Sequence, residues 1–168
     1  RQMIDYISGK ISTVVLLVNP TRDYVHKIIK TLQPSFLQFH GDETPKFCNQ
    51  FDYPYIKAIR VYPDLNIERA IEHFNPKGGF LFDTWHPKKY GGTGGTFDWD
   101  VLPNELKAPK ILAGGLTSTN VGQAIKIARP DIVDVSGGVE SLKGIKDERL
   151  IANFVDSVGS ADMKINKK

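Results

Sequence analysis

Six short apolar runs recur along the chain, each followed by a segment of helical periodicity, and this repeat limits the fold more than any other feature. The first run, residues 13–18, has no polar alternation, which is typical of a strand buried on both faces in a parallel sheet. Apolar residues then follow at the spacing of one helix face, from Val25 to Leu32. The expected strands are spaced by about 24 residues and begin at residues 14, 36, 55, 80, 111 and 132.

A regular series of parallel strands joined by helices predicts right-handed crossovers and leaves two folds open, a doubly wound sheet and a (β/α)8 barrel. Two further units at the same spacing would bring the chain to about 215 residues, within the usual range of a barrel. Residues 1–11 look like the end of a helix with no strand before it. We therefore predict an α/β TIM barrel, of which this chain carries the last six βα units.

The limits of the helices and of the domain follow from capping residues and polarity. Asp64 is the expected N-cap of a helix over residues 67–74. The last apolar helical pattern ends at Val158. The sequence therefore predicts a single barrel domain over residues 1–158, incomplete at its amino end, and a polar tail over residues 159–168.

Charge and cysteine content exclude several classes of function. The net charge is +3, and the basic residues are scattered, so neither a nucleic-acid nor a membrane partner is expected. The longest apolar run is too short to span a bilayer, and no signal peptide is visible. A single cysteine, Cys48, excludes an internal disulfide and a multi-cysteine metal cage. We expect a cytoplasmic protein without a metal.

Functional groups collect at the carboxyl ends of the strands in both candidate folds. Two diglycine segments, residues 112–116 and 134–139, each follow an expected strand directly and precede an expected helix. Glycine lets backbone N–H groups approach an anion closely, which predicts a phosphate site; the alternative is that these glycines only make tight turns. The expected phosphate ligands are Gly114, Gly115, Ser136, Gly137 and Gly138.

Asp83 directly follows the apolar run 80–82, so its carboxylate is expected at the mouth of the sheet. Partial burial would raise its pKa and suit it to proton donation; the alternatives are a helix cap or a partner for a loop lysine. The glycine-rich loop over residues 85–99 lacks the Walker lysine pattern, which argues against a nucleoside triphosphatase. This loop is either a lid or a flexible surface segment.

Gln38 and His40 alternate along the second expected strand, so their side chains point to the same side. His40 is either a hydrogen-bonding group near a substrate or a structural histidine. Cys48 has no activating partner beside it, and we expect it to be a packing residue rather than a nucleophile.

Together these segments resemble the phosphoribosylanthranilate isomerase family of tryptophan biosynthesis. The resemblance implies a (β/α)8 barrel and an aldose–ketose isomerase that needs no cofactor. Its substrate would be the phosphosugar N-(5-phosphoribosyl)anthranilate, and its product 1-(2-carboxyphenylamino)-1-deoxyribulose 5-phosphate. The matching stretches follow the family's order over nearly the whole chain, at residues 37–43, 57–60, 81–84, 90–94, 96–99, 112–116 and 133–140.

The resemblance also implies roles for individual residues. Asp83 would be the general acid, and the two diglycine turns would hold the substrate phosphate. Gly91, Gly92 and Gly94 would belong to a loop that covers the substrate. The pocket would be lined by Gln38, His40, Arg60 and Asp134.

The sequence departs from the family at its amino end. The family's general base is a cysteine at the end of the first barrel strand, and an arginine after the second strand meets the anthranilate carboxylate. Neither segment lies in this sequence, and Cys48 occupies a different place. We therefore expect that the 168 residues alone do not catalyse turnover. Unpaired edges of a six-stranded sheet would favour association, which leaves a homo-oligomer open.

Two other functions stay open at this stage. Related phosphosugar barrels, such as indole-glycerol-phosphate synthase or the histidine-pathway isomerase, share the diglycine phosphate loops but not the stretch over residues 90–99. The non-enzymatic alternative is an inactive fragment that keeps the phosphate site and only binds a ligand or a partner.

Overall fold

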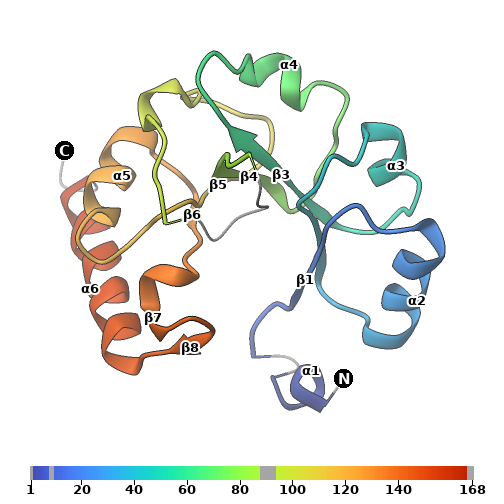
Figure 1. The fold of residues 1–168 in the computed structure, drawn as a ribbon, viewed down its shortest axis with the longest axis horizontal. Helices are drawn as coiled ribbons and strands as arrows, with labels where there is room; N and C mark the ends of the chain where they lie inside the picture. The colour runs from blue at the N-terminus through green and yellow to red at the C-terminus, as the bar shows by residue number, and fades with distance from the viewer. Residues whose placement is uncertain (1, 8–9, 88–93, 166–168) are drawn as a thin grey trace.

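The computed structural model describes residues 2–7, 10–87 and 94–165. All six expected strands form one parallel sheet in which neighbours in the sequence are neighbours in space. The strands follow an arc with helices along its outer side (Figure 1). Their bounds are β1 Val14–Leu17, β2 Phe36–Phe39, β3 Tyr55–Val61, β4 Gly79–Thr84, β5 Lys110–Leu112 and β6 Ile132–Val133.

Helices precede the sheet and connect its strands, as the repeat predicts. Threonine side chains cap two of them, because Thr21 Oγ1 accepts from the Tyr24 amide and Thr44 Oγ1 from the Phe47 amide. Two short 3-10 helices, η1 (Trp99–Val101) and η2 (Gly137–Val139), lie in the later loops. The α-helices are α1 Gln2–Ile7, α2 Arg22–Leu32, α3 Pro45–Asn49, α4 Ile67–Ile71, α5 Val121–Ala128 and α6 Glu148–Ile165.

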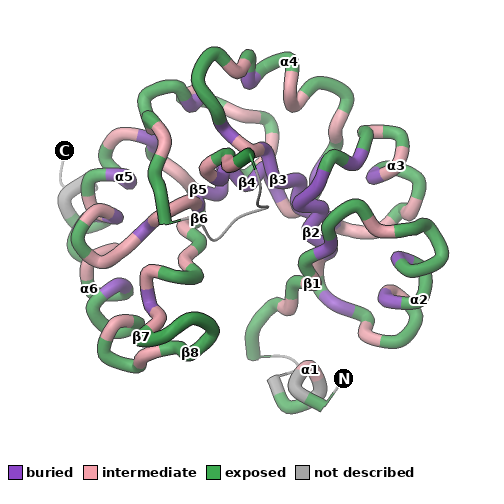
Figure 2. Tube along the Cα trace, in the orientation of Figure 1, coloured by how far each residue is buried: buried purple, intermediate pink, exposed green. Residues whose placement is uncertain are grey.

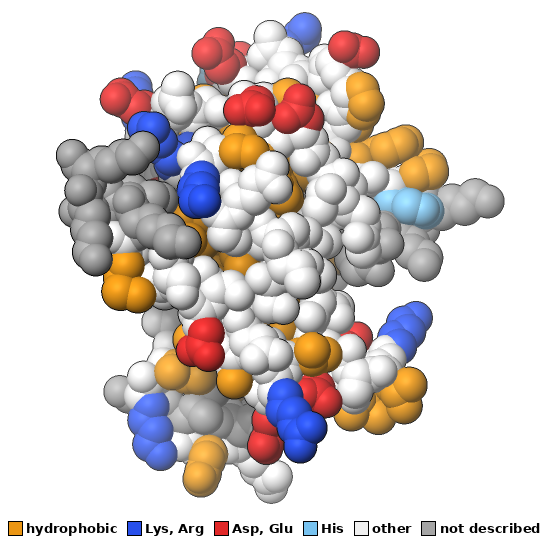
Figure 3. Space-filling model, turned by 90° about the vertical axis from the view of Figure 1, so that its left-hand side faces the viewer, with side chains coloured by type: hydrophobic (Ala, Val, Ile, Leu, Met, Phe, Trp, Pro, Cys, Tyr) orange, Lys and Arg blue, Asp and Glu red, His pale blue; other side chains and the backbone are white. Residues whose placement is uncertain are grey.

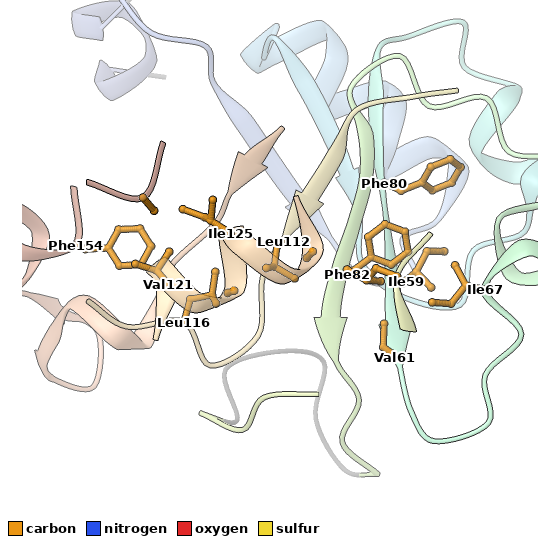
Figure 4. Packing of buried hydrophobic residues seen from close by; sticks show 14 of the residues in the cluster. Ile59, Val61, Ile67, Phe80, Phe82, Leu112, Leu116, Val121, Ile125 and Phe154 are labelled. Carbon is orange, nitrogen blue, oxygen red and sulfur yellow. The ribbon is translucent and has the colours of Figure 1, made fainter. Parts of the chain in front are cut away.

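Alternation along the strands separates an outer face, covered by helices, from an inner face. Outward side chains such as Ile59, Phe82 and Leu112 form the main hydrophobic cluster with Val121 of α5 and Phe154 of α6 (Figure 4). Burial is greatest in β3, β4 and β5, at the middle of the arc (Figure 2). A smaller cluster on the inner face contains Ile56, Ala58, Leu81, Ile111 and Ala113.

The two ends of the sheet are less covered than its middle. Leu17 packs under α2 and is 5% exposed, whereas its neighbour Leu16 faces inward and is 55% exposed. Ile132 in β6 is also exposed. Within the described ranges, the outer edges of β1 and β6 are paired with no other strand.

Two predicted limits are wrong. Helix α4 is capped by Asn66, whose Oδ1 accepts from the Arg69 amide at 2.9 Å; Asp64 has φ +67°, which places it in a turn before the helix. Helix α6 continues beyond Val158 to Ile165, so most of the expected tail is helical. The helix persists because Ala161 is buried in the main cluster, and such packing overrides the polar composition.

A short antiparallel hairpin, β7 (Glu140–Leu142) and β8 (Ile145–Lys146), follows β6 and was not predicted. On the face that carries α5 and α6, acidic and basic side chains are interspersed (Figure 3). None of the described helices combines the length and the apolar character needed to cross a bilayer.

Candidate active site

A cavity of about 370 Å³ opens at the carboxyl ends of β4, β5 and β6. Parallel strands all end at this rim, so groups from distant segments of the chain meet there. The Asp83 carboxylate and both diglycine turns face the same space, together with Gly94 of the following loop. The full lining is Asp83, Gly94, Ala113, Gly114, Gly115, Leu116, Thr117, Asp134, Ser136, Gly137 and Gly138.

The first diglycine turn needs glycine at both positions. Gly114 and Gly115 have φ of +83° and +61°, where other residues are strained. A Cβ on Gly114 would lie 2.4 Å from Thr84 Oγ1 and 3.0 Å from Asp83 Oδ1, and a Cβ on Gly115 would lie 2.4 Å from the Gly95 carbonyl oxygen. The turn is therefore packed directly against the end of β4.

The second diglycine turn uses its two glycines differently. A Cβ on Gly138 would lie 1.9 Å from the Leu116 carbonyl oxygen, so the two turns touch through their backbones. A Cβ on Gly137 would meet nothing within 4 Å. Gly138 is thus required by packing, whereas Gly137 faces open space beside the cavity.

Asp83 is buried and held by two hydrogen bonds. Its Oδ1 accepts from the Thr84 amide at 2.8 Å, and its Oδ2 lies 3.2 Å from His40 Nε2. The Gln38 side-chain nitrogen lies 2.9 Å from His40 Nδ1. With this nitrogen donating, Nδ1 is an acceptor, and the imidazole proton sits on Nε2 and points at Asp83. The prediction that Gln38 and His40 share one side of β2 is confirmed.

Asp134 supplies a second carboxylate to the same cavity. Burial raises the pKa of Asp134, and the negative charge of Asp83 raises it further. The Asp134 carboxyl therefore retains its proton to a higher pH than an isolated aspartate does.

Lys146 is a charged group of the rim that the sequence reasoning missed. Its Nζ donates to the Ser136 carbonyl oxygen at 2.9 Å and to Glu140 Oε1 at 2.7 Å, and lies 3.3 Å from Ser136 Oγ. The lysine reaches the second diglycine turn because the β7–β8 hairpin folds back on it. The sequence feature that could have indicated Lys146 is the polar segment that directly follows the second diglycine turn.

Of the other predicted site residues, Arg60 does not line this cavity but lies at the opposite side of the rim, and two glycines fall outside the described residues. Arg60 forms an ion pair with Asp42 and lines a neighbouring hollow of about 310 Å³, which also contacts Trp85. The predicted loop residues Gly91 and Gly92 fall outside the described residues.

Cys48 lies on α3, in the cluster that packs outside β1, β2 and β3. Burial raises the pKa of its thiol to about 12, which disfavours the thiolate needed for a base or a nucleophile. This location is compatible with the packing role expected of Cys48.

The curled parallel sheet, with its polar groups gathered at the carboxyl ends of the strands, is the architecture of a (β/α)8-barrel enzyme. The family described as N-(5'phosphoribosyl)anthranilate (PRA) isomerase matches residues 3–157. The chain belongs to this family.

Similar proteins agree with this assignment. An N-(5'-phosphoribosyl)anthranilate isomerase of Neisseria meningitidis serogroup C is 47% identical over 145 residues, which cover 86% of this chain and 70% of the relative. One from Pseudomonas putida strain W619 is 48% identical over 151 residues, covering 90% and 73%. The crystal structure of the Thermotoga maritima enzyme superposes with a TM-score of 0.81 at 30% identity, covering 95% of this chain and 78% of that one.

A further solved structure carries a ligand. It is a phosphoribosyl anthranilate isomerase in complex with reduced 1-(o-carboxyphenylamino)-1-deoxyribulose 5-phosphate, with a TM-score of 0.78, 28% identity and coverage of 95% and 77%.

Proposed function

We propose that the cavity at the carboxyl ends of β4, β5 and β6 binds N-(5-phosphoribosyl)anthranilate and that its residues take part in the isomerisation to the aminoketose. The observation that carries the proposal is that a buried carboxylate and two touching diglycine turns line one cavity. Such a cavity can hold the phosphate at one side while an acid reaches the sugar ring.

The phosphate would sit between the two diglycine turns. Backbone N–H groups at Gly115 and Gly137 can approach its oxygens because no side chain intervenes, and Ser136 adds a hydroxyl. Lys146 lies behind Ser136 and adds a positive charge that balances part of the phosphate charge. The neighbouring glycines Gly114 and Gly138 keep the two turns in contact.

Asp83 would act as the general acid. It would protonate the furanose ring oxygen, and the ring would open to a Schiff base. A base then removes the proton from C2, and the resulting enolamine tautomerises to the ketone. His40 would hold the Asp83 carboxyl toward the ring oxygen. Asp134, whose raised pKa favours its own protonated form, would supply a second carboxyl group to the same cavity.

Within the described part of the chain, we assign the base that removes the C2 proton to no residue. Cys48 is excluded because it lies on the far side of the sheet from the cavity and its thiol is stabilised in the protonated form. The test of the proposal therefore separates binding from turnover.

The reduced product analogue provides a direct test of binding. We expect it to bind with an affinity that inorganic phosphate weakens by competition, and to shift the amide resonances of the two diglycine turns. Asp83→Asn keeps the shape of the side chain, so we expect the analogue to bind within about threefold of the unmodified chain. Where turnover of authentic substrate is measurable, the same variant should reduce kcat by at least about 100-fold.

The rival phosphosugar barrels supply the specificity control. An analogue that binds no better than ribose 5-phosphate, or that leaves the diglycine amides unshifted, contradicts the proposed substrate. Asp83→Asn with full kcat contradicts the proposed acid alone.

A further inference from the structure

Glu43 and Lys57 form a buried ion pair at the side of the rim opposite the diglycine turns. The two side chains are 2% and 4% exposed, and Lys57 Nζ lies 3.0 Å from Glu43 Oε2. Neither residue lines the cavity of Asp83. Two charges removed from water in this way need a reason, because desolvation offsets much of their attraction.

All three N–H donors of the Lys57 ammonium are directed at the segment that carries His40. Besides Glu43, they donate to the Phe39 carbonyl oxygen at 3.2 Å and to the Gly41 carbonyl oxygen at 2.8 Å. The ammonium therefore binds the backbone on both sides of His40.

The Glu43 carboxylate completes this arrangement. It accepts from the Gly41 amide with both oxygens, at 3.1 and 3.0 Å, and its Oε1 also accepts from the Asn19 amide at the end of β1 at 2.8 Å. The His40 amide itself donates to the Leu17 carbonyl oxygen at 2.8 Å. Both peptide groups that flank the His40 Cα are thus fixed by this pair and by β1.

We propose that the Glu43–Lys57 pair is a positioning device, which fixes the backbone of His40 so that its imidazole Nε2 points at Asp83. The pair does not line the cavity of Asp83, and it acts through the backbone on both sides of His40. For its consequence in catalysis, this inference rests on the proposed role of Asp83.

The geometry favours positioning over stabilisation. An apolar pair of similar volume would also fill the space that the two side chains occupy, and such replacements of buried ion pairs are often neutral or stabilising. An apolar pair, however, cannot bind the Phe39 carbonyl, the Gly41 amide and the Gly41 carbonyl. The need to bind these backbone groups beside His40 therefore explains why the buried pair is charged.

Lys110 is a matched control for Lys57. Both lysines are 3% exposed when the whole residue is counted, and the Lys110 ammonium also binds backbone carbonyl oxygens, those of Pro103, Asn104 and Ala128. Lys110 begins β5, at the end of the sheet opposite the rim. Removal of a buried ammonium can thus be compared at Lys57, which binds the loop at the rim, and at Lys110, at the opposite end of the sheet.

The test is the state of the His40 ring, read from the ring-nitrogen chemical shifts of the 15N-histidine-labelled chain, with His40→Gln used for assignment. In the unmodified chain we expect the pattern of a single Nε2–H tautomer. Lys57→Met and Glu43→Gln should both shift it toward a mixture of tautomers, whereas Lys110→Met should leave it unchanged. A wild-type pattern in folded Lys57→Met, or an equal change in Lys110→Met, overturns the proposal.

Hydrogen exchange of the unmodified chain tests the same idea without a variant. We expect the Gly41 amide to be protected to about the same degree as the His40 amide, because both are bonded within the buried corner. Free exchange of Gly41 overturns the proposal, even if neither variant folds. Neither measurement uses a ligand, so failure of the reduced analogue to bind contradicts the proposed function and leaves this inference standing.

Discussion

The two sides of the rim reach a fixed geometry by different means. At the end of β2, buried side-chain charges hold the loop, through Glu43 and through Lys57 of the neighbouring strand β3. At the ends of β5 and β6, backbone touches backbone, since Gly138 lies against the Leu116 carbonyl and Gly115 against that of Gly95. The first side positions a side chain, His40, and the second leaves space for an anion. The two sides should therefore respond to different kinds of substitution.

The largest effect is expected where backbone contact leaves no room for a methyl group. Gly138→Ala would place a Cβ 1.9 Å from the Leu116 carbonyl oxygen, and neither backbone can move without disturbing the other turn. We expect the free energy of unfolding to fall by about 3 kcal/mol, measured by urea denaturation.

The adjacent glycine is the control for this loss. Gly137→Ala meets nothing within 4 Å, so its free energy of unfolding should stay within about 0.5 kcal/mol of the unmodified chain. Similar losses in the two variants would mean that the turns do not depend on close backbone contact.

The difference between the two sides also explains what could be predicted from the sequence. The diglycine turns were found because glycine pairs after strands are visible in the sequence itself, and Gln38 and His40 because alternation assigns them to one face. The Glu43–Lys57 pair was missed, although a signal exists: Lys57 is a charge inside the otherwise apolar start of β3, and a buried charge requires a partner.

The fold was predicted where apolar patterns are strong and missed where tertiary contacts decide. All six strands of the sheet begin within one residue of their expected starts. Helix α6 extends past Val158 because Ala161 packs in the core, which no local pattern reveals. The β7–β8 hairpin is short and exposed, so neither length nor apolar alternation marks it, and Lys146 was missed with it.

A smaller effect is expected at the phosphate side when charge, rather than shape, is changed. Lys146→Met removes the ammonium beside Ser136 and should weaken binding of the reduced analogue by about tenfold, or about 1.4 kcal/mol, by isothermal titration calorimetry. The loss should shrink at high salt because ions screen exposed charges.

Lys143→Met is the control, because it removes the same charge from the turn of the hairpin. We expect it to change the affinity by less than about twofold. Equal losses of affinity in the two lysine variants would mean that the net positive charge of the hairpin matters, and not the position of Lys146 at the second diglycine turn.

The smallest effect is expected in the pH dependence of stability, where two acids should act with opposite signs. Burial raises the pKa of Asp134 above its value in the unfolded chain, so its contribution is fully present below the unfolded pKa and is lost as the pH rises through the folded one. Asp134→Asn lacks this loss. Its free energy of unfolding, relative to the unmodified chain, should therefore increase from about pH 3 to about pH 7.

Glu140 should show the reverse. A hydrogen bond from Lys146, and a further one from the Gly144 amide, lower its pKa, so its contribution is present above the unfolded pKa and is lost as the pH falls through the folded one. Glu140→Gln should therefore be at its greatest disadvantage near neutral pH and match the unmodified chain in acid. Urea denaturation across this range compares the slopes of the two variants, which do not depend on any constant cost of substitution. A relative stability of Asp134→Asn that falls from about pH 3 to about pH 7 would mean that the cavity does not bury Asp134 as the structure has it.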